Sequence, residues 1–80
     1  MKVYLVYWCN GEMWEDYYEM VEAVFSSREK AVDYIVGKGY RSHECKSEWE
    51  KRNMADRYDS APDEFGHRNS MWVREMEVDA

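Results

Sequence analysis

The opening stretch KVYLVYWC, residues 2–9, most constrains what this chain can fold into. It is built almost entirely from β-branched and aromatic residues and ends at the turn dipeptide Asn10-Gly11, a pattern typical of a strand that enters a hairpin. Both alternating sets are apolar: Val3, Leu5 and Tyr7 form one, and Tyr4, Val6 and Trp8 form the other. Because both faces of such a strand need cover, the pattern predicts a central strand of a sheet.

The next stretch, NGEMWEDYYEMVEA at residues 10–23, fits two structures. As a helix it separates carboxylates from an apolar face, which would hold Met13, Tyr17, Met20, Val21 and Val24. As a strand, residues 17–25 have suitable β-branched and aromatic residues, with Val21, Ala23 and Phe25 on one side. We favour the strand over 17–25, preceded by a loop over 10–16 that carries most of the acidic residues.

A helix is predicted over residues 27–37, in the segment SSREKAVDYIVGKG. Ser26 and Glu29 fit a capping box, in which two side chains satisfy free backbone N–H groups at the helix start. Gly37 and Gly39 supply stop signals at the other end.

The charged segment RSHECKSEWEKRNMADRY, residues 41–58, fits two structures. Ser47 and Glu50 fit a second capping box, which favours a short helix near 46–57, but the apolar stripe is thin and a partly ordered excursion is the alternative. A loop rich in turn formers follows over 59–70, and the alternating residues 71–78 predict a closing strand.

The order of these segments predicts an α+β fold. We expect a small three-stranded, mainly antiparallel sheet packed with one α-helix, and a second short helix before the last strand if residues 46–57 are ordered. Eighty residues are enough for a single domain, spanning 1–80, with a small hydrophobic core.

Three pieces of the sequence resemble a family of short uncharacterised domains found in bacteria and their phages. They are VFSSREKAVDYI, the following Gly39-Tyr40 and the terminal WVREMEVD. In that family a strand similar to KVYLVY begins a hairpin, a capped helix follows, and an acidic, aromatic strand closes the sheet. The resemblance covers about half of the chain. It implies a small sheet with one packed helix and a phage-encoded protein, and it implies no catalytic residue. Residues 41–70 depart from the family pattern as an insertion, which leaves the pairing of the last strand open.

The net charge of −6 is distributed unevenly along the chain. Residues 3–27 hold five carboxylates and no Lys or Arg, whereas residues 28–57 hold eight basic and six acidic side chains. Direct nucleic-acid binding is disfavoured, because domains that bind phosphates normally show a basic excess on one face. An acidic protein is attracted to positive partners, which include the nucleic-acid-binding surfaces of other proteins.

The cysteine content and the N-terminus indicate a cytoplasmic protein. Cys9 and Cys45 are the two cysteines, too few for a disulfide scaffold of this size. Acidic residues follow the first apolar run where a leader cleavage site would need small residues, so Met1 is expected to begin the mature chain. No apolar run reaches the roughly 18 residues of a membrane span. If the protein is phage-encoded, its compartment is the host bacterial cytoplasm.

The acidic and aromatic residues after the first strand are the main candidate site. The predicted partner-binding residues are Glu12, Trp14, Glu15, Asp16, Tyr17 and Tyr18. Aromatic side chains would anchor a contact while the carboxylates attract Lys or Arg of a host protein with a basic surface. Strict mimicry of a nucleic acid requires carboxylates distributed like phosphates over an extended surface, which five acids in one stretch do not demonstrate. The structural alternative is a hairpin whose acids are solvated and whose aromatics cover a small core.

A second candidate surface is the face of the sheet that one helix cannot cover. Residues expected on this surface are Trp8, Met20, Val24, Trp72 and Met76. A contiguous exposed patch of this kind would mark a homodimer or partner interface. Alternatively, residues 41–58 fold back over this face, in which case Trp49 belongs to the core.

Metal binding and catalysis are both disfavoured. The metal-ligand types Cys9, His43, Cys45 and His67 lack the spacing of a zinc site, and no cofactor is expected. Cys45 with His43 or His67 and Asp63, or Glu15 with Asp16, could act in catalysis only in a cleft that a short chain rarely builds. The expectation is therefore a non-enzymatic protein. The alternative is a small-ligand module that holds a nucleotide or metabolite between aromatics and Arg41, Lys51 and Arg52.

Overall fold

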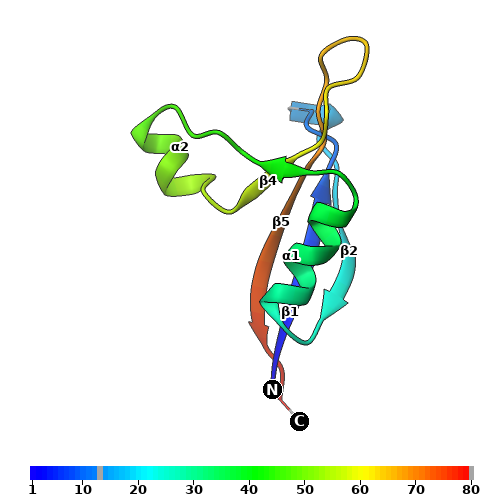
Figure 1. Cartoon of the computed structure of the whole chain (residues 1–80), viewed down its shortest axis with the longest axis vertical. Helices are drawn as coiled ribbons and strands as arrows, with labels where there is room; N and C mark the ends of the chain where they lie inside the picture. Colours follow the sequence, from blue (N-terminus) through cyan, green and yellow to red (C-terminus); the bar gives the residue numbers. More distant parts are fainter. Residues whose placement is uncertain (13, 80) are drawn as a thin grey trace.

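The computed structural model describes residues 1–12 and 14–79, with Trp14 described by its backbone alone. Within these residues the chain forms five strands, two α-helices and one short 3-10 helix (Figure 1). In chain order they are β1 (Lys2–Cys9), η1 (Trp14–Asp16), β2 (Glu19–Phe25), α1 (Arg28–Gly37), β3 (Arg41–Ser42), α2 (Glu48–Asn53), β4 (Arg57–Asp59) and β5 (Ser70–Glu77). The predicted α+β class is confirmed, but the predicted number of three strands is wrong.

The strands form one antiparallel sheet in the order β2-β1-β5-β4-β3. β1 lies between β2 and β5 and pairs with both, which confirms that residues 2–9 form an internal strand. The two strands that were not predicted lie at the two ends of the charged segment 41–58, β3 at its start and β4 at its end. They extend the sheet beyond β5 instead of covering one of its faces, and they make β4 the second pairing partner of β5.

Helix α1 packs across one face of the sheet and encloses the core there (Figure 1). The buried cluster consists of Val6, Ala31, Ile35, Tyr40, Met71 and Val73. Trp8 packs at its border, and the indole N–H of Trp8 donates a hydrogen bond to the hydroxyl of Tyr40 at 3.2 Å. Because the cluster is small, each of its large side chains contributes a sizeable share of the stability.

The opposite face of the sheet is covered partly by its own arginines. The rings of Tyr7 and Trp72 are stacked, with centroids 5.5 Å apart. The guanidinium of Arg57 lies 4.3 Å from the centroid of the Trp72 ring, and that of Arg74 lies 5.0 Å from the Tyr7 ring. These cation–π contacts shield the aromatic surface, so Trp72 is only 8% exposed although α1 lies on the other face.

The hairpin of β1 and β2 decides between the two structures considered for residues 10–23. Residues 19–25 pair with β1, so the strand prediction is confirmed and the helical alternative is wrong, apart from the single turn η1. Met13, which the helical alternative used, lies outside the described residues. Val6 pairs with Ala23 and Tyr7 with Val21, which leaves Glu22 as an extra residue in a β-bulge. The bulge places Val21 on the face opposite Ala23, which corrects their predicted common side.

Helix α1 begins one residue later than predicted. The N-cap is Ser27, whose backbone is extended and whose hydroxyl accepts a hydrogen bond from the N–H of Lys30 at 3.2 Å. Ser26, the predicted cap, accepts instead from the ammonium of Lys30 at 3.3 Å. At the other end Gly39 has a φ of +91°, which a residue with a side chain rarely adopts, so its role as a stop signal is confirmed.

Helix α2 starts at the predicted cap but remains peripheral. The Ser47 hydroxyl accepts from the N–H of Glu50 at 3.1 Å, and the Glu50 carboxylate accepts from the N–H of Lys46 at 2.8 Å. The helix covers 48–53, about half of the predicted range, and contains no buried residue. Trp49 is 64% exposed, so the alternative that placed it in the core is wrong. Figure 1 shows α2 standing to one side of the sheet.

Candidate functional site

Two loops meet at the end of the molecule that lies opposite Met1 and the end of β5 (Figure 1). We call this region the loop end; it comprises residues 10–12, 14–18 and 60–69. Gly11 has a φ of +73°, and a Cβ atom on it would lie 2.0 Å from the carbonyl oxygen of Arg68. This close approach requires glycine. The carboxylate of Glu12 also lies 3.3 Å from Nδ1 of His67, so backbone and side-chain contacts both join the loops.

Asn10 organises the first loop. Its side-chain oxygen accepts from the backbone N–H groups of Glu12 and Tyr18 at 3.1 and 3.2 Å. Its amide donates to the carbonyl oxygen of Asp16 at 2.7 Å, and its own N–H donates to the carbonyl of Tyr18 at 3.1 Å. An Asn side chain bonded to its own loop backbone fixes a turn. Asn10 therefore fixes the backbone of this loop at Glu12 and at residues 16–18.

The predicted partner-binding residues of the first loop are displayed to solvent. Glu12, Glu15 and Asp16 are exposed, and Tyr17 and Tyr18 are 43% and 58% exposed. The backbone of Trp14 forms the start of η1, while its side chain lies outside the described part of the structure. The structure thus brings the three carboxylates and the two tyrosines together at the loop end.

Tyr17 and Tyr18 point toward different sides of the sheet. The ring of Tyr18 contacts Trp8 edge-on, with centroids 6.3 Å apart, on the side covered by α1. The hydroxyl of Tyr17 donates to the carboxylate of Glu19, which pairs with Cys9 on the other side. Partial burial and this hydrogen bond to a carboxylate raise the pKa of Tyr17 to about 12. A partner that contacts both tyrosines has to enclose the loop end instead of lying flat on one face.

The second loop adds an aromatic residue that the sequence reasoning missed. The Asp63 carboxylate accepts from the N–H groups of Phe65 and His67, both at 2.9 Å, and the N–H of Asp63 donates to the carbonyl of His67. The two hydrogen bonds to its carboxylate lower the pKa of Asp63. The turn presents Phe65 with 85% of its surface exposed. The sequence signal was the pattern Asp63-Glu-Phe-Gly66, which places an aromatic inside a turn.

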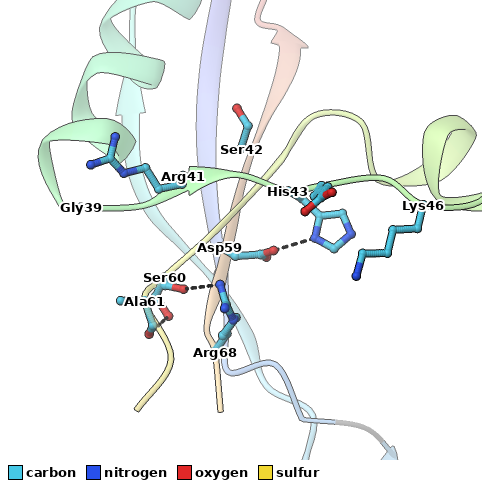
Figure 2. Close-up of a pocket in the computed structure, with 10 residues that line it drawn as sticks. Gly39, Arg41, Ser42, His43, Lys46, Asp59, Ser60, Ala61 and Arg68 are labelled. Atoms are coloured by element: carbon cyan, nitrogen blue, oxygen red, sulfur yellow. Dashed lines mark hydrogen bonds and ion pairs between the residues drawn. The ribbon is translucent and has the colours of Figure 1, made fainter. Parts of the chain in front are cut away.

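A pocket of about 610 Å³ lies beside β3 and β4 (Figure 2). Its lining includes the cations Arg41, Lys46 and Arg68, together with His43 and Asp59. Of the basic residues in the small-ligand alternative, Arg41 lies at this pocket. Lys51 and Arg52 belong to α2 and do not line it.

The structure does not assemble the metal and catalytic candidates into one site. Cys9 is buried, and the Cys45 thiol faces the backbone carbonyls of His43 and Glu50. Nδ1 of His43 lies 2.6 Å from the Asp59 carboxylate, while Asp63 is bonded within its own turn. Among the described residues no group of three or more His, Cys, Asp and Glu is arranged to hold a metal ion.

The five residues of the second candidate surface divide between the two faces of the sheet. Trp8 and Met20 are paired on the side of α1, whereas Val24, Trp72 and Met76 lie on the opposite side. Met20, Val24 and Met76 are exposed, Trp8 is half-buried and Trp72 is buried. These residues therefore do not form the single contiguous patch that the sequence suggested.

Comparison of the chain with protein-family models, with curated proteins and with solved structures gives no match. Within the described residues, no helix has both the length and the apolar character needed to cross a membrane. The fold and the site define a small α+β protein with an ordered, acidic and aromatic loop end. Its function has to be argued from these residues.

Proposed function

We propose that this protein is a non-enzymatic binding protein that modulates, and most simply inhibits, a macromolecular partner through its loop end. The observation that carries the proposal is the display of exposed aromatic rings beside carboxylates on two loops that are each fixed by internal hydrogen bonds. Tyr17, Tyr18 and Phe65 supply the contact area. Glu12, Glu15 and Asp16 supply the charge.

The physical basis is that aromatic and charged residues have different roles in protein interfaces. Aromatic side chains that become fully desolvated provide most of the binding energy, and surrounding charges steer the encounter and select the partner. Loops that are already ordered lose little conformational entropy on binding. The hydrogen bonds of Asn10 and Asp63 provide this preorganisation at the loop end.

The partner that fits this surface is a protein with a basic groove or patch. The resemblance to domains of bacteria and their phages adds a setting, in which a phage protein occludes a host nucleic-acid-binding or defence protein in the bacterial cytoplasm. The carboxylates of the loop end then contact Lys or Arg side chains that otherwise contact nucleic acid. This mechanism needs no catalytic group and no cofactor.

The test is capture of a partner from bacterial lysate on the immobilised protein. Changing Glu12, Glu15 and Asp16 together to Lys should abolish capture, and raising the salt concentration should weaken it, because charge attraction is screened. The matched control changes Asp33, Asp56 and Asp79 to Lys; these exposed carboxylates lie outside the loop end and alter the net charge equally. If the first triple variant retains the same partner, the proposal fails.

The aromatic contribution is tested separately with Phe65→Ala. Since Phe65 is almost fully exposed, its removal should leave the folding stability unchanged within about 0.5 kcal/mol. As an interface anchor its loss should weaken capture about tenfold or more. Val36→Ala, an exposed apolar residue on α1, is the matched control and should leave capture unchanged.

A further inference from the structure

The pocket beside β3 and β4 is formed by two stretches that the sheet brings together. One wall is formed by Gly39, Arg41, Ser42, His43, Glu44 and Lys46, and the other by Asp59, Ser60, Ala61 and Arg68. Arg41 pairs with Asp59 in the sheet, and the N–H of His43 donates to the carbonyl of Arg57 at 2.8 Å. Ser60 ties the second wall to Asn69 through two hydrogen bonds of 2.9 Å. Hydrogen bonds within the chain therefore fix the backbone on both sides of the pocket.

The charges around this pocket are opposite in sign to those of the protein as a whole. Arg41, Lys46 and Arg68 line it, and none of the three forms an ion pair with another residue that the structure describes. Carboxylates exceed basic residues by seventeen to eleven in the sequence. Three cations at one pocket that have no ion-pair partner among the described residues are therefore unusual for this protein. Figure 2 shows Lys46 and Arg68 on the same side of the β3 strand, coming from opposite walls, whereas the guanidinium of Arg41 extends to the other side of that strand.

The acidic residues of the lining offset these cations only in part. The Asp59 carboxylate is engaged by Nδ1 of His43 at 2.6 Å and by the Ser70 hydroxyl, which donates at 2.8 Å. Glu44 is exposed at the margin of the pocket. The site thus presents cationic groups with free donors, which are the groups that bind phosphate oxygens.

The residues that line the pocket limit the chemical class of ligand that it can bind. Among the residues that line the pocket the one aromatic ring is the imidazole of His43, and its two nitrogens face the carboxylates of Asp59 and Glu50. The volume is within the range of small-molecule sites. We propose that this pocket binds a small, polar, phosphate-bearing anion with Lys46 and Arg68 as the principal contacts. The pocket shares Ser60, Ala61 and Arg68 with the loop end, but none of the carboxylates and aromatics proposed to bind a protein lines it.

The experiment is a titration of the full chain with inorganic pyrophosphate, followed by amide chemical shifts and by calorimetry. Shifts are expected at residues 39–46, 60–61 and 68. The double variant Lys46→Ala/Arg68→Ala should bind pyrophosphate about tenfold or more weakly, because two charge-assisted hydrogen bonds are lost. The matched control is Lys51→Ala/Arg52→Ala, which removes the same charge from α2, outside the pocket, and should bind as the unaltered protein does.

Three outcomes would overturn the proposal. The first is the absence of saturable shifts at the pocket residues, and the second is equal weakening in the two double variants, which would indicate only a general effect of charge. The third is equally tight binding of citrate, which would contradict the assignment to phosphate. Lysate capture by the single variant Lys46→Ala separates this proposal from the proposed function, since Lys46 lines the pocket and lies outside the loop end; weaker binding of pyrophosphate with unchanged capture is expected.

Discussion

Helices α1 and α2 begin with the same local device and have different places in the fold. In both, a serine with an extended backbone accepts a hydrogen bond from the N–H three residues later, at Ser27 for α1 and at Ser47 for α2. Helix α1 buries Ala31 and Ile35 completely against the sheet. Helix α2 buries no residue and leaves Trp49 exposed. A capping sequence thus specifies where a helix starts and does not specify whether the helix joins the core.

The contacts that hold each helix differ in kind. Helix α1 is held by apolar packing against β1, β2 and β5. Helix α2 contacts the preceding segment 43–45 mainly through Glu50. The Glu50 carboxylate lies 3.6 Å from Nε2 of His43, and the Glu50 carbonyl accepts a hydrogen bond from the Cys45 thiol. Burial of apolar area contributes far more to stability than exposed polar contacts do. Substitutions in the two helices should therefore have effects of different size.

The largest effect is expected for Ile35→Ala. This side chain is fully buried, and its truncation leaves a cavity as well as removing apolar contacts, so the free energy of unfolding should fall by about 2–5 kcal/mol. Chemical denaturation measures the change. Val36→Ala, on the exposed side of the same helix, is the control and should change stability by less than about 0.5 kcal/mol. Equal effects of the two would contradict the orientation of α1.

An intermediate effect is expected for Ser27→Ala. Loss of the cap leaves a backbone N–H at the start of a core helix without its partner, which should cost about 1 kcal/mol. The same change at Ser26 should have little effect, because Ser26 bonds only the flexible ammonium of Lys30. If thermal or chemical unfolding showed a larger loss of stability for Ser26→Ala than for Ser27→Ala, the N-cap would be Ser26, as the sequence suggested.

A smaller global effect is expected for Ser47→Ala. The lost cap should destabilise α2, but because this helix contributes no buried residue, global unfolding should change by less than about 0.5 kcal/mol. Hydrogen exchange measures the local effect. The amides of Lys51 and Met54, which bond to carbonyls of Ser47 and Glu50, should exchange faster while those of α1 stay protected. Loss of protection in both helices would show that they unfold as one unit.

The smallest effect is expected for Trp49→Ala. Removal of a core tryptophan costs about 3–5 kcal/mol, whereas Trp49 is exposed and its removal should change stability by less than about 0.5 kcal/mol. Denaturation curves followed by circular dichroism measure this without relying on tryptophan fluorescence. A loss of more than about 1 kcal/mol would mean that Trp49 packs against the rest of the protein and that α2 belongs to the core.

The sequence predicted those features that depend on neighbouring residues. The apolar alternation of residues 2–9, the stop at Gly39 and the cap at Ser47 are local, and each was found where expected. The second sheet edge was missed because β3 and β4 contain only two and three residues, too few to show an alternating pattern. Their pairing depends on β5, which follows later in the chain.

The candidate site was predicted in part for the same reason. The carboxylates and tyrosines after β1 are neighbours in sequence, so their exposure on one loop could be anticipated. The contact of Gly11 with Arg68 joins residues far apart in the chain. No pattern among neighbouring residues predicts it. Phe65 was not among the predicted partner-binding residues because it lies in the second loop, far in sequence from the acidic stretch after β1. The bulge at Glu22 likewise depends on the register against β1.

The pairing of β1 with β5 has a consequence for how the protein folds. Lys2 pairs with Glu77, so the middle of the sheet joins the two ends of the described chain. The β1–β2 hairpin and α1 are close in sequence and can form early, but the other edge of β1 stays open until β5 is available. Closing so long a loop is entropically costly, and sheets dominated by distant contacts fold slowly. During synthesis the apolar edge of β1 is therefore exposed until β5 has been made, and an unpaired apolar strand edge favours aggregation.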